Sequence, residues 1–456
     1  MKVEKKRKKH LQNCINLVFV FYTMTNLKKV FLPVASVALL FSCHQQHKKI
    51  VSTDFVDSLI THYSPSSLSI ENQKEKQFWK SRIDPKLAGY VNESRYAGCL
   101  GLDFHLSGDI DSLKKSDSVL QKINNNFNHR EASVQLALAS HCVTEHRFMQ
   151  ADSFLQKAKL LGLRPYESNT SSFDVDFELG RYADAKAALN AMSSPNDYGY
   201  NFRKSKMEHL NGALDSSIAT MQHAAKAAND NTYLKDIALA NAADLCIHAG
   251  DLQKANELYM ECIALNSDDF HSIMGIGWIA LVHDHNDSLA AKIFKFVLSK
   301  NKLPDALFKL TQVAANMNDS SFQIKYAKAF EEKASAIVYD RMYNKYLLQL
   351  YTGILQKPER AEDITKDELN NRATPQTYAW YAWALFCNNK KEEAYKIFEK
   401  YVSGKPLEGL ELYWMGMMMD GLDKKYNAIE FFKAAYKNKY DLDPSFRKTI
   451  ETRLSL

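Results

Sequence analysis

The sequence predicts an all-α chain built from repeated helix hairpins, that is, an α-solenoid. Gly and Pro together make up about 6% of the 456 residues, roughly half of average usage, which argues against a turn-rich β fold. A hydrophobic content of 46% argues against disorder. From about residue 86 onwards, apolar residues recur at steps of three and four, as on amphipathic helices. This pattern itself repeats every 34 residues or so, which favours one extended array over several separate domains.

Residues 1–43 form a segment distinct from the rest of the chain. They contain eight basic residues and one acid, a charge of +7 against +6 for the whole chain, so the remainder carries −1. Lys28 and Lys29 precede an apolar run, 30–41, that is too short to span a bilayer as a helix. A basic stretch followed by such a run is the layout of a secretory signal. The basic balance therefore reflects export, and we expect no nucleic-acid partner.

The end of this run, Leu40-Phe41-Ser42-Cys43, resembles a bacterial lipobox. The resemblance implies cleavage before Cys43, acylation of Cys43 with chains such as palmitate, and anchoring to a membrane without a transmembrane helix. Met24 is then the natural start of the protein. Residue 44 is His rather than the Asp of an inner-membrane retention signal, which favours the outer membrane. The alternatives are an ordinary signal peptide with a coincidental Cys and a short buried helix.

Residues 44–70 are predicted to be a tether, because they contain the turn-forming run His-Tyr-Ser-Pro-Ser-Ser at 62–67. The solenoid is predicted over 71–456. Its first element is a short helix, 71–80, which caps the first hairpin.

Small residues at intervals close to multiples of 34 mark the repeat, and each precedes a large apolar residue by four positions. The small residues are Ala151, Ala185, Ala255, Ala290, Ala394 and Ala428. In the last unit, Gly416 precedes Ala428 by twelve positions and Phe432 follows it by four. These residue types are expected to pack the repeat, because small side chains allow close helix contact and the aromatic ring fills the gap toward the next hairpin.

This pattern resembles the tetratricopeptide repeat (TPR), a 34-residue helix hairpin. The resemblance implies a right-handed solenoid of about ten hairpins between 86 and 440, with residues 445–456 as a closing turn or cap. Turns between paired helices are expected at Gly108, Gly180, Gly212 and Gly250. The units near Ser217, Ile324 and Ala361 depart from the pattern and could be looser hairpins.

The common nucleotide-binding, hydrolase and zinc-protease motifs are absent from the sequence, so we expect neither catalysis nor a cofactor. The cysteines contain no CxxC pair, and no zinc site is expected. Cys246 and Cys262 lie on the two helices of one hairpin, where two core thiols are favoured over a disulfide. The polar run 283–287 suits a turn with Asp287 as helix cap better than a metal site. His141 and His146 are expected at the surface.

In the TPR family, first helices line the concave face of the solenoid. The family positions that point into this groove correspond here to Trp383, Phe386, Tyr413 and Met417. Aromatic and Met side chains suit a peptide or partner helix, but in a terminal repeat they could also pack against the closing turn.

The sequence therefore predicts a lipid-anchored, non-catalytic scaffold or adaptor that binds other envelope proteins or peptides in its concave groove. The alternative is a glycan-capturing outer-membrane lipoprotein of the starch-binding type. That family interrupts its helical repeats with long loops, which the regular spacing here does not leave room for.

Overall fold

The computed structural model describes residues 48–192 and 194–456. The predicted leader 1–43 and the lipidation site Cys43 lie outside this part of the chain. All regular elements of the described residues are helices, as the sequence predicts, and none is strand. No helix among them is both long and apolar enough to cross a bilayer.

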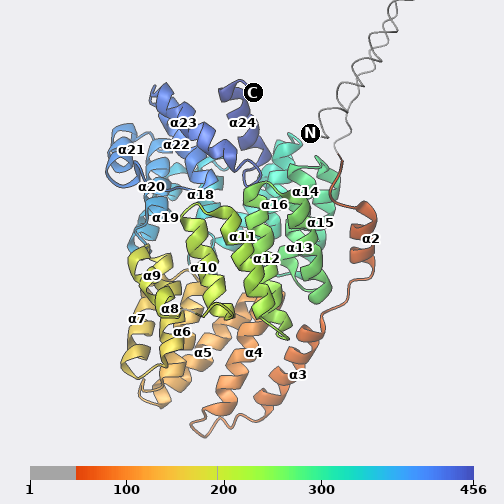
Figure 1. The fold of residues 1–456 in the computed structure, drawn as a ribbon, viewed down its shortest axis with the longest axis vertical. Coiled ribbons are helices and arrows are strands. Elements are labelled where there is room, and N and C mark those ends of the chain that lie inside the picture. Colours follow the sequence, from red (N-terminus) through yellow and green to blue (C-terminus); the bar gives the residue numbers. More distant parts are fainter. Residues whose placement is uncertain (1–47, 193) are drawn as a thin grey trace, which may run out of the picture. The chain divides into compact units, whose positions relative to one another are not determined.

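Ten consecutive helix hairpins make up the array (Figure 1), in agreement with the predicted number. The first helices of the pairs are α4 (Val91–Ser107), α6 (Ala132–Thr144), α8 (Pro165–Glu178), α10 (Tyr198–Leu210), α12 (Thr232–Ala249), α14 (Phe270–Val282), α16 (Asp305–Asn316), α18 (Asn344–Thr352), α20 (Pro375–Cys387) and α22 (Gly409–Gly421). The second helices are α5 (Ile110–Asn126), α7 (Phe148–Leu160), α9 (Tyr182–Ala191), α11 (Leu214–Ala227), α13 (Leu252–Leu265), α15 (Asp287–Lys300), α17 (Ser320–Ala334), α19 (Pro358–Asn371), α21 (Lys391–Ile397) and α23 (Lys425–Lys437).

Two short elements interrupt this regularity, and one helix closes the array. A 3₁₀ turn, Ile337–Tyr339, precedes α18, and α21 continues as a π-helical turn, Phe398–Val402. After the tenth hairpin, Pro444 begins the closing helix α24 (Pro444–Leu454). A Pro in the first turn suits a helix start, because the N–H that it lacks would have no partner within the helix.

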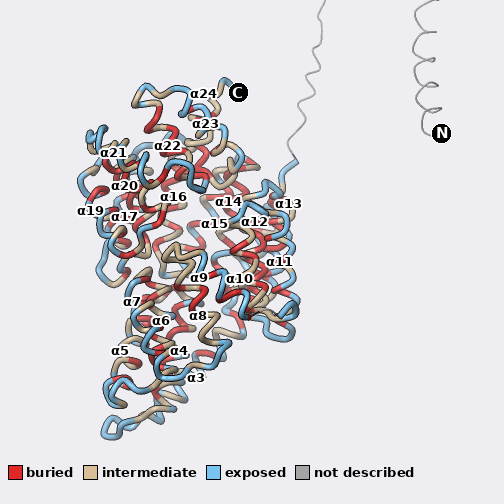
Figure 2. The backbone as a smooth tube through the Cα atoms, turned by 60° about the vertical axis from the view of Figure 1, so that its left-hand side comes forward, coloured by how far each residue is buried: buried red, intermediate tan, exposed pale blue. Residues whose placement is uncertain are grey.

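The repeat-defining small residues pack as their spacing predicts. All eight repeat-packing positions are buried, and the buried stretches alternate with exposed ones along the helices (Figure 2). In the last hairpin, a Cβ placed on Gly416 would lie 2.7 Å from the Phe432 ring. Gly277 meets Phe294 at the same distance. Each aromatic ring therefore occupies space that only a glycine on the facing helix leaves open.

The hairpin near Ser217, which departs from the repeat pattern, is nevertheless tightly held. Ser205 and Ser217 are both fully buried and exchange hydrogen bonds, Ser205 Oγ to Ser217 O at 2.7 Å and Ser217 Oγ to Ser205 O at 2.9 Å. Two small hydroxyls thus bridge the helices at a position where alanines pack elsewhere.

The predicted turns between paired helices are confirmed. Gly108, Gly180, Gly212 and Gly250 have φ between 72° and 78°.

From Lys48 onwards, the segment predicted as a tether is folded onto the array. It forms helix α2 (Thr53–Thr61) and the start of α3 (Ser67–Ser81), and Val56 is fully buried. Asp284 accepts hydrogen bonds from the backbone N–H groups of Ile50 and Val51 at 2.9 and 2.8 Å.

The turn-forming run 62–67 binds a second carboxylate, that of Asp268. Tyr63 Oη donates to Asp268 at 2.6 Å, and Ser66 donates to it through both its N–H and its hydroxyl at 2.9 Å. Asp268 and Asp284 flank α14, so this N-terminal segment (residues 48–70) is held at both ends of one helix. Ser66 is also the N-cap of α3, which explains why a turn-like composition begins a helix.

Hairpins distant in sequence also contact each other, because turns of early hairpins meet loops between late ones. The Lys302 N–H donates to Ser107 O at 2.9 Å. The Asn371 side chain accepts from the Phe148 N–H at 2.9 Å and donates to His146 O at 2.7 Å. These contacts join the first two hairpins to the middle and late part of the array.

A similar set of contacts joins the C-terminal end to the sixth hairpin. Trp278 Nε1 donates to Tyr440 O at 2.7 Å, and the Arg447 guanidinium donates to Val282 O at 3.0 Å. The described part of the chain is therefore cross-linked by hydrogen bonds beyond its nearest-neighbour packing.

Candidate functional site

The inner face of the array contains three adjoining hollows of about 280, 370 and 280 Å³. Tyr346 lines the first and second, His248 lines the second and third, and Glu408 lines the first and third. We call these three adjoining hollows the interior chamber. First helices from α8 to α22 supply most of its wall, as expected for the concave face of a solenoid.

Aromatic side chains with fixed orientation form part of the wall. The hydrogen bond to Tyr440 O orients the Trp278 indole, and Lys309 Nζ lies 3.7 Å from the centroid of its ring. Trp380 Nε1 donates to Glu411 Oε1 at 2.7 Å. Tyr346 packs edge-on against Phe308, with ring centroids 4.7 Å apart. Trp278 and Trp380 are only 7% and 4% exposed and mainly hold the wall together, whereas Tyr346, 38% exposed, offers a fixed aromatic surface to the chamber at little entropic loss.

Ion pairs within the wall hold most of its charges. His271 Nε2 lies 3.0 Å from Asp244, whose charge raises the pKa of His271 to about 9. His248 Nδ1 lies 2.5 Å from Asp441. Burial is the largest single effect and opposes protonation of His248. The hydrogen bond to Asp441 and the negative charges of Asp441, Glu408 and Asp244 together outweigh it and raise the pKa to about 9. Both imidazoles are therefore cations at neutral pH, each beside a carboxylate.

Lys309 differs from the other cations of the chamber. Burial lowers the pKa of Lys309 to about 8, partly offset by the surrounding carboxylates. Apart from the Trp278 ring, its ammonium group has no hydrogen-bond or ion-pair partner among residues 48–192 and 194–456. The ammonium group is thus available to a ligand.

The two histidines expected at the surface are only partly exposed. His141 Nδ1 lies 2.7 Å from Asp117. His146 has a positive φ of 55° and lines the first hollow, and burial lowers its pKa to about 4. Their side chains belong to contacts between helices, which sequence spacing alone does not show.

The run 283–287 forms the turn between α14 and α15, as the sequence predicts. The cap of α15 is Asn286, whose side chain accepts from the Leu289 N–H, one residue before the predicted Asp287. Asp284 binds the N-terminal segment, as described above.

Trp383 and Tyr413, two of the four predicted groove residues, are 9% and 7% exposed. Trp383 donates to Thr352 Oγ1 at 3.0 Å and stacks on Trp414. Tyr413 stacks on Phe446 of the closing helix at 4.4 Å between centroids. Phe386 and Met417 are partly buried beside the same core. None of the four lines the interior chamber, and their binding role stays a prediction.

The described cysteines are all unpaired, which agrees with the prediction of core thiols at Cys246 and Cys262. The chamber residues, by contrast, were missed by the sequence analysis. Trp278, Lys309 and Tyr346 all lie on first helices, so the concave-face rule could have found them.

No protein-family model matches the chain, and no curated protein matches its sequence. Among solved structures, a Rap protein in complex with competence and sporulation factor is 12% identical, covers 71% of this chain and 96% of its own, and has a TM-score of 0.39. A tetratricopeptide repeat protein from Parabacteroides merdae is 15% identical over 57% of this chain and 99% of its own, with a TM-score of 0.33. PilF from Pseudomonas aeruginosa is 10% identical over 47% and 97%, with a TM-score of 0.35. The chain is thus similar to TPR-type helical-repeat structures.

Proposed function

We propose that the protein is a non-catalytic interaction scaffold, held at the bacterial outer membrane by a lipid on Cys43, which binds a segment of another envelope protein in its interior chamber. The interior chamber is the observation that carries this proposal. Its aromatic and charged wall suits a polypeptide, whose side chains are also mixed in character. His146 and Trp278, which take part in contacts between distant hairpins, line the chamber, and we expect the partner to bind as a slender extended segment.

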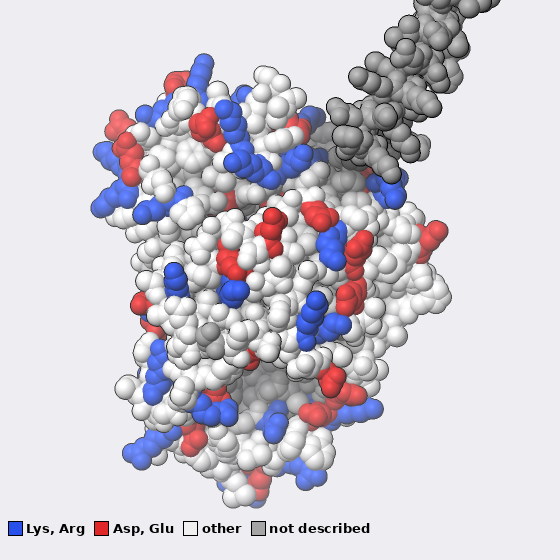
Figure 3. Space-filling view, viewed as in Figure 1, with Lys and Arg blue, Asp and Glu red and all other residues white. Residues whose placement is uncertain are grey.

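The surface charge supports a protein partner over a nucleic acid. Lys and Arg are interspersed with Asp and Glu on the face shown in Figure 3, with no extended patch of one sign. Residues 44–456 carry a net charge of −1. Phosphate-backbone binding relies on a concentration of basic side chains, which this face does not present.

Photocrosslinking in the native envelope tests the binding site. A photoreactive residue in place of Tyr346 in the chamber should capture a partner segment, which mass spectrometry then identifies. The same residue in place of Tyr426, which is 78% exposed on α23, is the matched control. A synthetic peptide of the captured segment should bind the wild-type protein, and Tyr346→Ala should weaken binding about tenfold or more, as for an aromatic anchor. Equal capture from both positions contradicts the proposal, and saturable glycan binding without a protein partner favours nutrient capture instead.

Cys43→Ser tests the anchor separately. The variant should move from the membrane fraction to the soluble fraction while keeping the helical circular dichroism of the wild type, because acyl chains contribute about 0.8 kcal/mol per buried CH₂. Unchanged partitioning into detergent would contradict lipidation at Cys43.

A further inference from the structure

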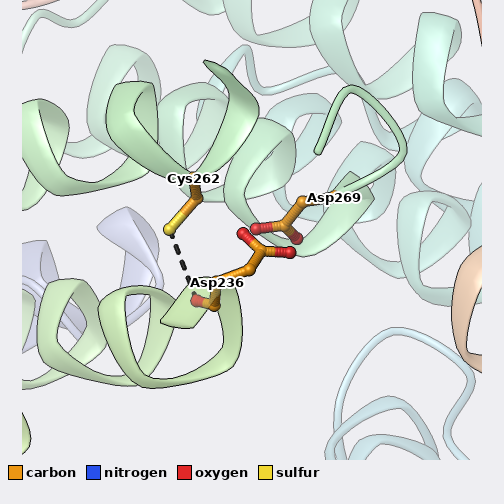
Figure 4. A group of neighbouring side chains, drawn as sticks. All are labelled: Asp236, Cys262 and Asp269. Carbon is orange, nitrogen blue, oxygen red and sulfur yellow. Dashed lines mark hydrogen bonds between the residues drawn. The ribbon is translucent and has the colours of Figure 1, made fainter. Parts of the chain in front are cut away.

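Three consecutive helices bring two carboxylates and a thiol together outside the interior chamber. Asp236 lies on α12, Cys262 on α13, and Asp269 is the N-cap of α14. One ligand-type atom from each lies within 4.8 Å of the other two. In Figure 4 the carboxyl groups of Asp236 and Asp269 face each other, with the sulfur of Cys262 beside them.

The protein satisfies only some of the polar atoms of this cluster. The Cys262 thiol donates to the backbone oxygen of Asp236 at 3.6 Å. Asp236 Oδ2 accepts from Asn266 at 2.9 Å and Asp269 Oδ1 accepts from the Ser272 N–H at 3.0 Å, but the second oxygen of each carboxylate is buried without a hydrogen bond. Lys235, the neighbouring basic residue in sequence, pairs with Glu261 instead. Two facing carboxylates without a cation repel each other, and orphaned buried acceptors are unfavourable.

Ser272 provides an independent indication of a ligand at this place. Its side chain is fully buried and lies beside the Cys262 thiol, and its hydroxyl oxygen has no other polar partner among the described residues. A buried serine hydroxyl ordinarily finds a partner. Its oxygen is therefore a candidate fourth ligand on the Cys262 side of the cluster.

We propose that Asp236, Cys262 and Asp269 bind a structural zinc ion, with the Ser272 hydroxyl in the fourth position. Tetrahedral zinc with ligand distances of about 2.0–2.3 Å holds its ligand atoms about 3.3–3.8 Å from one another. The three ligand atoms already lie within 4.8 Å of one another, so small side-chain rotations would bring them to these distances. A thiolate among the ligands selects zinc over magnesium or calcium. Binding releases the thiol proton to solvent, and the ion neutralises the two carboxylates.

Such a site would join the fifth and sixth hairpins, because α12 and α13 form one pair and α14 begins the next. The three residues lie beside a hydrophobic core that contains Cys262 and the buried side chains of these three helices. Sequence motifs could not show it, since the three residues are separated by 26 and 7 positions and include no second cysteine or histidine.

Metal analysis of the full-length protein tests the site. The reduced, chelator-treated wild type should bind one zinc ion per chain in equilibrium dialysis, and its melting temperature should rise with zinc and fall again with chelator. Cobalt should replace zinc and give a thiolate-to-cobalt charge-transfer band. Asp236→Asn, which keeps an acceptor for Asn266, and Cys262→Ala should each lose stoichiometric zinc, and Cys262→Ala should lose the band.

Cys246→Ala is the matched control, because Cys246 is a buried unpaired thiol of the same hairpin outside the cluster. It should retain both the zinc and the cobalt band. If either cluster variant does not fold, the cobalt spectrum and zinc stoichiometry of the other variant and of the wild type still decide. The proposal is overturned if the wild type does not bind stoichiometric zinc. The two carboxyl groups would then share a proton in place of a metal ion. Zinc retained by Cys262→Ala, or lost equally by Cys246→Ala, also overturns the proposal.

Discussion

At the residue scale, the close contact between Gly416 and Phe432 is the sharpest packing constraint in the last hairpin. A Cβ at position 416 would lie 2.7 Å from the ring of Phe432, which is itself 1% exposed. Gly416→Ala should therefore lower the free energy of unfolding by about 1–3 kcal/mol through overpacking, as measured by urea denaturation.

Gly98→Ala is the control for Gly416→Ala. Gly98 lies inside α4, and a Cβ there would meet nothing within 4 Å. Alanine should be neutral or stabilise the helix by up to about 1 kcal/mol. The double variant Gly416→Ala with Phe432→Leu should recover part of the lost stability. Equal losses from the two single alanine variants would show that packing against Phe432 is not the cause.

The pairing of His248 with Asp441 predicts a pH dependence. The folded pKa of His248 is about 9 against an ordinary value of 6.5, so its contribution to stability is fully present below pH 6.5 and is lost as the pH rises through 9. Urea denaturation across this window should show stability falling by on the order of 1 kcal/mol, after screening at a partly exposed side chain. Asp244, Glu408 and the stacked ring of His209 also face this imidazole.

His248→Gln should flatten part of this pH dependence. The remaining part should come from His271, whose pKa is raised to about 9 by Asp244 and which changes stability in the same direction. Lys309, whose pKa is lowered to about 8, offsets part of this loss above pH 8. A wild-type protein equally stable at pH 6.5 and pH 9 would contradict the assignment.

At the element scale, Asp284 holds the N-terminal segment onto α14 and α15. Asp284→Ala leaves the N–H groups of Ile50 and Val51 without their acceptor, a loss of about 1–3 kcal/mol. Hydrogen exchange in residues 48–61 should accelerate, with little change in the other hairpins. Asp57→Asn, which removes an exposed ion pair with Lys292, should change exchange by much less. Unchanged exchange in the Asp284 variant would mean that apolar contacts such as Val56 hold the segment.

The elements themselves were largely predictable, because hairpins of this kind are specified by local patterns. The spacing of Ala151, Ala394 and Ala428 indicates helix contacts, and the glycines mark the turns. The N-terminal segment was not predictable in the same way. Its polar run has the composition of a linker, and only the presence of Asp268 some 200 residues later gives those hydroxyls a buried partner.

At the scale of the whole molecule, the chamber depends on how far the array curves, and curvature arises from small rotations between successive hairpins. The repeat pattern does not encode these rotations residue by residue. The sequence could therefore indicate that first helices form a concave face, but not that Trp278 and Tyr346 would lie on one chamber wall. The proposed zinc site could not be predicted for the same reason, because Asp269 is the N-cap of α14 in the next hairpin and its place depends on the rotation between the two hairpins.

Contacts between distant hairpins should also change how the molecule unfolds. A solenoid with nearest-neighbour contacts alone can lose its hairpins progressively. Here Asn371, 4% exposed, joins the end of α19 to the turn between α6 and α7 through two hydrogen bonds. Asn371→Ala should therefore broaden urea unfolding and reduce its m-value, since the two regions no longer open together. Asn388→Ala, which removes a hydrogen bond to Glu362 in the adjacent hairpin, should shift the midpoint and leave the m-value unchanged. If Asn371→Ala also shifts only the midpoint, long-range hydrogen bonds do not set the cooperativity of the array.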